Sequence, residues 1–335
     1  MMVSIEREAV NEMSQSLRAI KDRIPVDSFT DERYYPPPTA SRRDIALYFL
    51  VMVAMDHRLS RPGKPYEAVI GGRLFHGADL LYYKGMEAFK RDPSFFDPEN
   101  LARATAKTVL DWLSVNQNGR RVGPPDPEVR ALLLRDLGEK LLRYYGGDAY
   151  MLVAESRGFL RRGVGEGFID LVKVFRAYQD PVEKKAFLLA KFLERRGVLE
   201  VKDHYNKEVP VDNHLVRIAL RTGIISVDEE TLEKISLGVE FSEEEDILLR
   251  YATRMAYKEV ARRSGIDPFI LDDFLWGFGR RCCTVSSPTC RAGCREKCGG
   301  MGGCVGESCV FQGWCRAYSS PLFMVSEHRF VKWWY

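Results

Sequence analysis

Residues 209–224 read VPVDNHLVRIALRTGI, and this stretch holds the most informative pattern in the chain. Pro210 and Asp212 stand just before a run in which apolar residues recur at three- and four-residue spacing, as on one face of a helix. Aspartate is favoured at the first position of a helix, because its carboxylate accepts a hydrogen bond from an unpaired backbone N–H. The stretch therefore predicts a helix that begins at Asp212.

Helical signals also dominate the rest of the 335 residues, whereas runs of strict alternation are scarce. Gly or Pro marks the end of three expected helices, at residues 128–145, 168–178 and 182–196. Ser242 and Glu245 form a capping box that opens a long helix through Arg262, and Asp267-Pro268 opens another that runs to about Phe278. The sequence therefore predicts an all-α fold.

The chain divides by composition into three expected parts. Residues 1–40 are an N-terminal lead-in, and residues 41–278 are a helical core of two subdomains with an exposed linker near residues 116–127 (NQNGRRVGPPDP). Residues 279–335 are a cysteine-rich module. The apolar stretch IALYFLVMVAM at residues 45–55 is shorter than the roughly 20 residues that span a bilayer, so we expect a buried helix and no membrane partner.

The 209–224 stretch closely resembles the endonuclease III superfamily pattern V-D-x-H-x-x-R-x-x-x-R-x-G. The matching residues are Val211, Asp212, His214, Arg217, Arg221 and Gly223. The resemblance implies an N-glycosylase of the helix-hairpin-helix (HhH-GPD) type, with Asp212 facing the sugar of the nucleotide that is cut. A carboxylate suits that chemistry, because glycosidic cleavage builds positive charge on the sugar. We expect His214 and Arg217 to be scaffold, and Arg221 to reach a phosphate or pair with a surface acid.

A second catalytic candidate lies in EKKAFLLAKF at residues 183–192. It is similar to the R-K-T-A helix start whose lysine is the Schiff-base nucleophile of endonuclease III-like lyases, and Lys184 is the matching position. Archaeal 8-oxoguanine glycosylases and queuosine salvage glycosylases carry a comparable lysine and the same later aspartate. Lys191 is the alternative nucleophile, and paired lysines at a helix start can also be simply solvated. The hairpin L-P-G-V-G that precedes this lysine in the family is absent.

The first half of the chain carries weaker resemblances. Residues 55–66 (MDHRLSRPGKPY) look like the archaeal 8-oxoguanine enzymes, whereas residues 75–89 and 137–156 look like the queuosine salvage proteins. These resemblances suggest residues that contact or stack on the base. The substrate-binding candidates are Asp56, His57, Arg58, Phe75, His76 and Tyr83.

All eight cysteines follow Arg281, which in an intracellular protein favours metal binding over a general disulfide framework. Endonuclease III holds a [4Fe-4S] cluster on Cys-x6-Cys-x2-Cys-x5-Cys. The resemblance implies four ligands, namely Cys283, Cys290, Cys309 and Cys315, with residues 291–308 as an insertion. Alternatives are a contiguous set of Cys290, Cys294, Cys298 and Cys304, a zinc ion on the same thiols, or a second cofactor. Cys282 and the three remaining cysteines could also pair as disulfides, which spacing does not decide.

Charge adds a weaker signal. The formal net charge is only +3, but residues 279–335 contain eight Lys or Arg against three acids, a surplus of five. A basic C-terminal module is compatible with phosphate contacts and equally with an ordinary solvated surface.

These patterns lead to one expected function and two alternatives. We expect a DNA glycosylase of base excision repair, with a possible AP-lyase step, that acts as a monomer on DNA. The first alternative is a queuosine-salvage-type nucleotide N-glycosylase that takes a free modified nucleotide, and the second is a non-catalytic nucleic-acid-binding protein. The N-terminus lacks the apolar run of a secretory signal, so we expect a cytoplasmic, nucleoid-associated protein.

Overall fold

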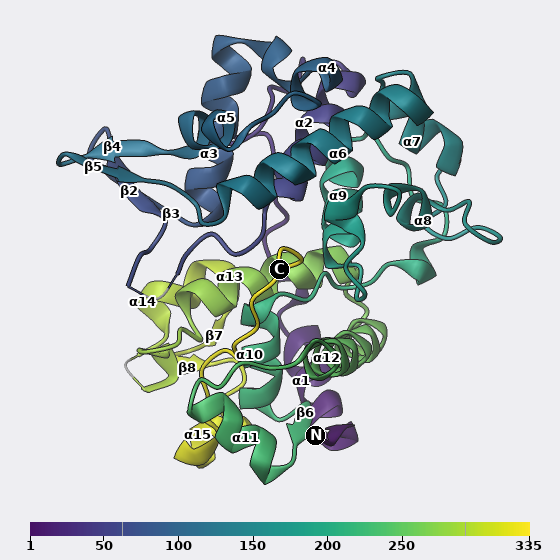
Figure 1. Ribbon diagram of the computed structural model, residues 1–335. Coiled ribbons are helices and arrows are strands. Elements are labelled where there is room, and N and C mark those ends of the chain that lie inside the picture. Colours follow the sequence, from purple (N-terminus) through teal and green to yellow (C-terminus); the bar gives the residue numbers. More distant parts are fainter. Residues whose placement is uncertain (62, 292) are drawn as a thin grey trace. The chain divides into compact units, whose positions relative to one another are not determined.

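The computed structural model describes residues 1–61, 63–291 and 293–335, which divide into two compact units. Unit 1 comprises Met1–Asp27 and Lys207–Val331, and unit 2 comprises Ser28–Asn206 and Lys332–Tyr335. The expected predominance of helix is confirmed, although the described chain also contains short two-stranded sheets (Figure 1). Residues 62 and 292, which fall within two of the stretches discussed above, lie outside the described residues.

Unit 1 is built from both ends of the chain. Its helices are α1 (Arg7–Arg18), α10 (Asn213–Thr222), α11 (Glu229–Ser236), α12 (Glu243–Ser264), α13 (Pro268–Arg281), α14 (Arg295–Cys298) and α15 (Arg316–Ser319). Its strands are β1 (Val3–Ile5), β6 (Ile225–Val227), β7 (Cys304–Val305) and β8 (Ser308–Cys309). β1 pairs antiparallel with β6, and α1 packs against α12. The first residues therefore belong to unit 1 through β1 and α1.

Local sequence explains the frame around α10. Ser242 caps α12 with the expected capping box, and Gly223 ends α10 in the left-handed conformation, at φ 84°. α13 packs against α10 at Gly279, where an added Cβ would stand 2.8 Å from the Cβ of His214. The glycine thus allows the backbone of α13 to approach the start of α10 closely.

Unit 2 is also mainly helical. Its helices are α2 (Arg42–Met55), α3 (Ala78–Arg91), α4 (Pro98–Leu101), α5 (Ala106–Leu113), α6 (Pro127–Tyr145), α7 (Tyr150–Ser156), α8 (Phe168–Val172) and α9 (Lys184–Arg195). Two hairpins complete it, formed by β2 (Glu67–Ile70) with β3 (Arg73–His76) and by β4 (Val115–Gln117) with β5 (Arg120–Val122). The apolar stretch at residues 45–55 lies in α2 and is buried, as expected. α9 packs against α2.

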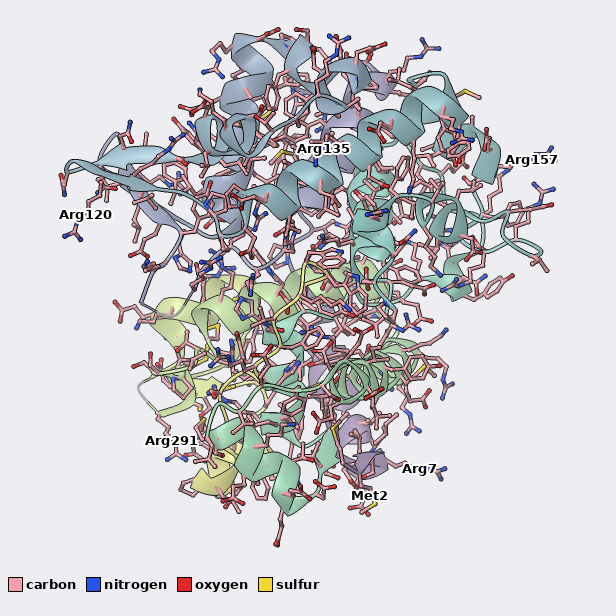
Figure 2. The ribbon with its side chains drawn as sticks, viewed as in Figure 1. Met2, Arg7, Arg120, Arg135, Arg157 and Arg291 are labelled. Atoms are coloured by element: carbon pink, nitrogen blue, oxygen red, sulfur yellow. A yellow bond between two sulfur atoms is a disulfide. The ribbon has the colours of Figure 1, made fainter. Side chains whose placement is uncertain are left out.

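The first part of the linker expected near residues 116–127 forms a β-hairpin. Asn118 and Gly119 both have positive φ, at 51° and 72°, and they turn the chain so that β4 and β5 pair. Asn-Gly is the preferred dipeptide of such tight hairpins, so the signal was present in NQNGRR. Figure 2 shows Arg120 beside this turn.

The helix ends follow the Gly and Pro signals closely but not everywhere. α6 stops at Tyr145, before the left-handed Gly146, as expected. The helix expected over residues 168–178 is shorter, because α8 ends at Val172 and residues 176–178 form a separate 3-10 turn. Within the described residues, no helix combines the length and the apolar character that a membrane crossing requires.

Candidate active site and cysteine centre

Asp212 lies at the N-terminus of α10, in unit 1, as the sequence predicts. Its Oδ1 accepts a hydrogen bond of 3.0 Å from the backbone N–H of Leu215, which caps the helix. Among the described residues, Oδ2 makes no hydrogen bond, and the side chain is half-exposed. One carboxylate oxygen therefore fixes the side chain on the helix, and the other is available to a ligand.

The residues that follow Asp212 form a fixed ionic network. His214 Nδ1 lies 2.7 Å from Glu327 Oε1, and Arg217 pairs with the same carboxylate. Burial alone would lower the pKa of His214, but the nearby carboxylates of Asp212 and Glu327 outweigh it, so the pKa is raised. Arg217 also donates to the carbonyl of Gly279 at 2.7 Å. These contacts agree with the scaffold role expected of His214 and Arg217, whereas nothing in the local sequence indicated Glu327.

Arg221 has a different role from the one expected. It is 1% exposed, so it neither reaches out to a phosphate nor pairs with a surface acid. Its guanidinium donates to the carbonyls of Val325 and Thr284, both at 2.7 Å, and approaches Cys283 Sγ at 3.4 Å. The second arginine of the motif therefore joins α10 to the cysteine-rich module. A buried arginine that satisfies several carbonyls can be recognised only in the folded structure.

The lysine candidates lie in unit 2, at the start of α9. The buried carboxylate of Asp180 accepts from the backbone N–H groups of Lys184 and Lys185, at 2.7 and 3.2 Å. Burial raises the pKa of Asp180 to about 6, and these two N–H groups partly offset that rise. Lys184 is 8% exposed, and its Nζ lies 3.4 Å from the carbonyl of Asp56. Asp180 therefore positions both lysines, a role that the sequence did not suggest.

Lys185 is the more deeply buried of the two. Its Nζ contacts the carbonyl of Trp333 at 2.9 Å, the carbonyl of Ala54 at 3.0 Å and Nδ1 of His57 at 3.2 Å. Burial and the positive charge of Lys184 lower its pKa well below the usual value. These contacts tie the last residues of the chain to α2 and α9. The alternative candidate Lys191 is also buried and stacks near Phe29 and Phe192.

The polar substrate-binding candidates lie just after α2. Asp56 caps the end of this helix and is half-exposed. His57 is 3% exposed, and among the described residues its Nε2 has no hydrogen-bond partner. Burial and the charges of Arg130 and Lys185 lower the pKa of His57 well below its usual value. Arg58 pairs with Asp126.

The remaining three candidates lie at the second strand of one hairpin and on the helix that follows it. Phe75 is 4% exposed and stacks obliquely on Tyr83, with ring centroids 4.5 Å apart. His76 lies on the surface of the β2–β3 hairpin, opposite Glu67 in the strand register, and the two side chains form an ion pair at 3.1 Å. Phe75 and Tyr83 thus lie together, whereas His76 faces solvent.

The eight cysteines separate into two groups of four. Disulfides join Cys282 to Cys298 and Cys294 to Cys304, and we call these four residues the bridged quartet. The other four are free thiols, and we call them the free quartet: Cys283, Cys290, Cys309 and Cys315. The free quartet is the set that the endonuclease III spacing picked out. The bridged quartet is Cys282 with the three cysteines of the insertion, which was one of the pairings that the spacing left open.

The free quartet converges although it is spread along the sequence. The pKa of Cys309 is raised to about 12, mainly by burial, with smaller contributions from the charges of the other three cysteines. Cys315 behaves similarly, with a pKa raised to about 11 by burial and by the charges of Cys283 and Cys290. The electrostatic interaction between two charged groups weakens as the distance between them grows. Cys283 Sγ and Cys315 Sγ each lie 3.4 Å from an atom of Arg221. Burial disfavours the thiolate forms of Cys309 and Cys315 unless positive charge is supplied.

The two quartets lie beside each other. Cys282 and Cys283 are consecutive at the end of α13, and Cys304 faces Cys309 across the β7–β8 pair. Arg291, labelled in Figure 2, donates to the carbonyl of Ala317 at 3.2 Å and so joins the start of the insertion to α15. The insertion is thus packed into unit 1 and not looped away from it.

A compact group of sulfur atoms could hold a metal ion. The Sγ atoms of Cys294, Cys298 and Cys304 are buried and lie within 4.8 Å of one another. In the disulfide form these atoms belong to the two adjacent bridges. The structure therefore supports the predicted metal-binding character of the module, and the sulfur positions are compatible with more than one metal.

Comparisons with known proteins leave the family open. Neither protein-family models nor curated proteins give a match to this chain.

Proposed function

We propose that this chain is an N-glycosylase of the helix-hairpin-helix class, and that it removes a modified or damaged base from DNA. The observation that carries the proposal is the half-exposed carboxylate of Asp212, held by a cap hydrogen bond with its second oxygen unused among the described residues. Cleavage of an N-glycosidic bond develops positive charge on the sugar, and a fixed anion stabilises that charge without having to reorganise.

The surroundings of Asp212 support a positioning function for the rest of the motif. His214, Arg217 and Glu327 form a network that fixes the first turn of α10, and Gly279 lets α13 pack directly behind it. Catalytic groups work best on rigid elements whose side chains are locked by further contacts. The motif thus supplies one reacting group, Asp212, and the residues that hold it in place.

Lys184 is the proposed nucleophile for a lyase step. An amine attacks the sugar C1′ only when it is unprotonated and reachable. Lys185 is fully buried, and its Nζ donates to two carbonyls and contacts His57 Nδ1, whereas the Nζ of Lys184 contacts one carbonyl at 3.4 Å. The contacts therefore give Lys185 a structural role and leave Lys184 as the more available amine.

Borohydride should trap the enzyme on a substrate duplex, because reduction converts the imine between lysine and sugar to a stable amine. We expect the wild-type adduct to map to Lys184 by peptide mass spectrometry and to disappear in Lys184→Gln. Mapping on the wild-type protein avoids any doubt about folding of the variant. An adduct on Lys185 or Lys191 would contradict the assignment, and base release without any adduct would show that water is the nucleophile.

We also propose that the free quartet holds a [4Fe-4S] cluster. Burial raises the pKa of Cys309 and of Cys315, so their thiolates need compensating positive charge, which the irons would provide. The Arg221 guanidinium, 3.4 Å from Cys283 Sγ, and the backbone N–H of Phe311 near Cys309 are donors typical of cluster sulfurs. Such a cluster would act here as a structural cross-link of the basic C-terminal module.

A nucleotide N-glycosylase of the queuosine salvage type is the second candidate. One observation favours it: residues 163–165 form an exposed turn with Val164 fully exposed, and this turn is not the L-P-G-V-G hairpin that precedes the lysine in DNA glycosylases. The same Asp212 chemistry would then act on a free nucleotide.

Salt dependence of binding should separate the two candidates. A duplex binder neutralises several phosphates, so its affinity should fall by about 100-fold or more between 50 and 200 mM salt. A pocket for one nucleotide should lose less than about tenfold over the same range. The titration should use a panel of lesion duplexes and queuosine monophosphate in parallel. Tight binding of the nucleotide with no duplex affinity would replace DNA as the substrate.

A further inference from the structure

The bridged quartet forms a second sulfur centre beside the free quartet. Its four side chains are among the most buried in the module, with Cys282 1% exposed and both Cys294 and Cys298 0% exposed. Three of its sulfur atoms lie within 4.8 Å of one another, and the fourth, that of Cys282, is bonded to Cys298. Four cysteines are thus gathered in one buried region. Cys294 and Cys298 lie at the start and at the end of α14, Cys282 directly follows α13, and Cys304 lies in β7.

This arrangement matches the needs of a tetrahedral metal ion. Zinc bound by four thiolates has Zn–S distances of about 2.3 Å, which places the sulfur atoms about 3.8 Å apart. The sulfur atoms of Cys294, Cys298 and Cys304 lie within 4.8 Å of one another, so once the two bridges are reduced these side chains are near enough to share one ion. Complete burial suits a structural zinc site, which leaves no position open to water.

Donors around the sulfur atoms suit thiolates as well. The Thr289 hydroxyl lies 3.5 Å from Cys298 Sγ and can donate to it. The N–H of Cys298 bonds to the carbonyl of Cys294, so the ligand-bearing turn of α14 is already formed. Gly303 packs against Cys298, where an added Cβ would stand 3.1 Å from the Cβ of that cysteine. The backbone that carries Cys294 and Cys298 is therefore already folded and packed in the disulfide form.

We propose that the bridged quartet is a redox-dependent zinc site. When it is oxidised, the two disulfides hold residues 291–308 in place. When a dithiol reductant donates two electrons and two protons to each disulfide, the reductant itself becomes a disulfide and four thiols form. Binding of one Zn²⁺ then breaks four S–H bonds, releases four protons to solvent and makes four Zn–S bonds. The insertion is therefore cross-linked in both states, by two disulfides when oxidised and by one zinc ion when reduced.

The site is independent of the cluster proposed on the free quartet, because the two sets share no cysteine. Metal content can therefore be assigned to one set or the other by substitution. This independence also means that the zinc proposal can fail while the cluster proposal stands, and the reverse.

The test uses the full chain, purified anaerobically and divided into disulfide-intact and phosphine-reduced samples. Zinc chloride is added to both, excess ion is removed, and zinc and iron are counted separately by elemental analysis. We expect about one zinc per chain in the reduced sample and less than about a tenth of that in the oxidised one. Addition of cobalt(II) to reduced protein should give the absorption bands of a tetrahedral thiolate site.

Variants locate the ion. In reduced protein, Cys294→Ser and Cys304→Ser should weaken zinc binding by roughly 100-fold, whereas the control Ser286→Ala, at an exposed position of the same module, should leave it unchanged. Alkylation of the wild-type protein gives a readout that needs no variant: zinc should protect Cys282, Cys294, Cys298 and Cys304 together. Reduced protein that takes up no zinc, or zinc binding that is unchanged in both Cys294→Ser and Cys304→Ser, would overturn the proposal.

Discussion

Asp212→Asn should lower the rate of base release by about 100- to 1,000-fold while the fold and ligand binding stay intact. The change removes the negative charge that stabilises the developing positive sugar, and the loss of one fixed electrostatic contact in an active site costs roughly 100- to 1,000-fold. Asparagine is as good a helix cap as aspartate, so the hydrogen bond from the Leu215 N–H is kept. Single-turnover release of the base from lesion duplexes and from queuosine monophosphate measures the effect.

Asp228 provides a matched control for this variant. It caps α11 in the same unit in the same way, with Oδ1 accepting from the Thr231 N–H at 2.9 Å. Asp228→Asn should leave base release within about twofold of the wild type, because asparagine keeps the cap and only the cap is shared between the two positions. Equal activity in Asp212→Asn and Asp228→Asn would remove the basis for the glycosylase proposal and favour a non-catalytic binding protein.

Replacing any member of the free quartet by alanine should strip the iron from the protein. Anaerobically purified wild-type protein should be brown, with a broad absorbance near ~400 nm and roughly four irons per chain. Each of the variants Cys283→Ala, Cys290→Ala, Cys309→Ala and Cys315→Ala should fall below about one iron per chain. Because a cofactor that binds only the folded state adds its binding free energy to stability, unfolding should become easier by roughly 3 kcal/mol or more.

Cysteines of the bridged quartet serve as the control for the cluster. Cys304→Ala breaks one disulfide, which by itself typically costs about 2–4 kcal/mol, so stability alone cannot distinguish the two groups. Iron content can, because Cys304→Ala and Cys294→Ala should keep the brown colour. Loss of iron from these variants, together with retention in Cys309→Ala, would instead place the cluster on the contiguous set Cys290, Cys294, Cys298 and Cys304. Colourless wild-type protein that contains only zinc would exclude a cluster.

Local sequence was sufficient wherever one short segment carries the whole signal. The cap at Asp212, the capping box at Ser242 and the stop at Gly146 all involve groups within a few residues of each other, and the structure has each of them. The same is true of the predominance of helix. The Asn118-Gly119 turn is equally local. The Gly and Pro residues that follow it favour an exposed loop, whereas Asn-Gly favours the hairpin that forms.

The cysteines show where local information ends. Spacing singled out Cys283, Cys290, Cys309 and Cys315, but it could not decide how the other four pair, because pairing depends on which side chains meet in space. The structure decides it by seating α14 against α13 and by facing Cys304 with Cys309 across the β7–β8 pair. The prediction that the leftover cysteines could form disulfides is confirmed in this form of the protein.

The sequence by itself determined the predominance of helix and the capped carboxylate of Asp212, because these depend on neighbours along the chain. Only the tertiary structure decided the partners of the charged side chains. Arg221 looked like a surface residue until the fold placed four carbonyls and a thiol around it, and Lys185 became the buried lysine only when the last residues of the chain folded onto α2 and α9. A buried charge is stable only with several acceptors around it, and those acceptors come from distant segments that no local pattern specifies.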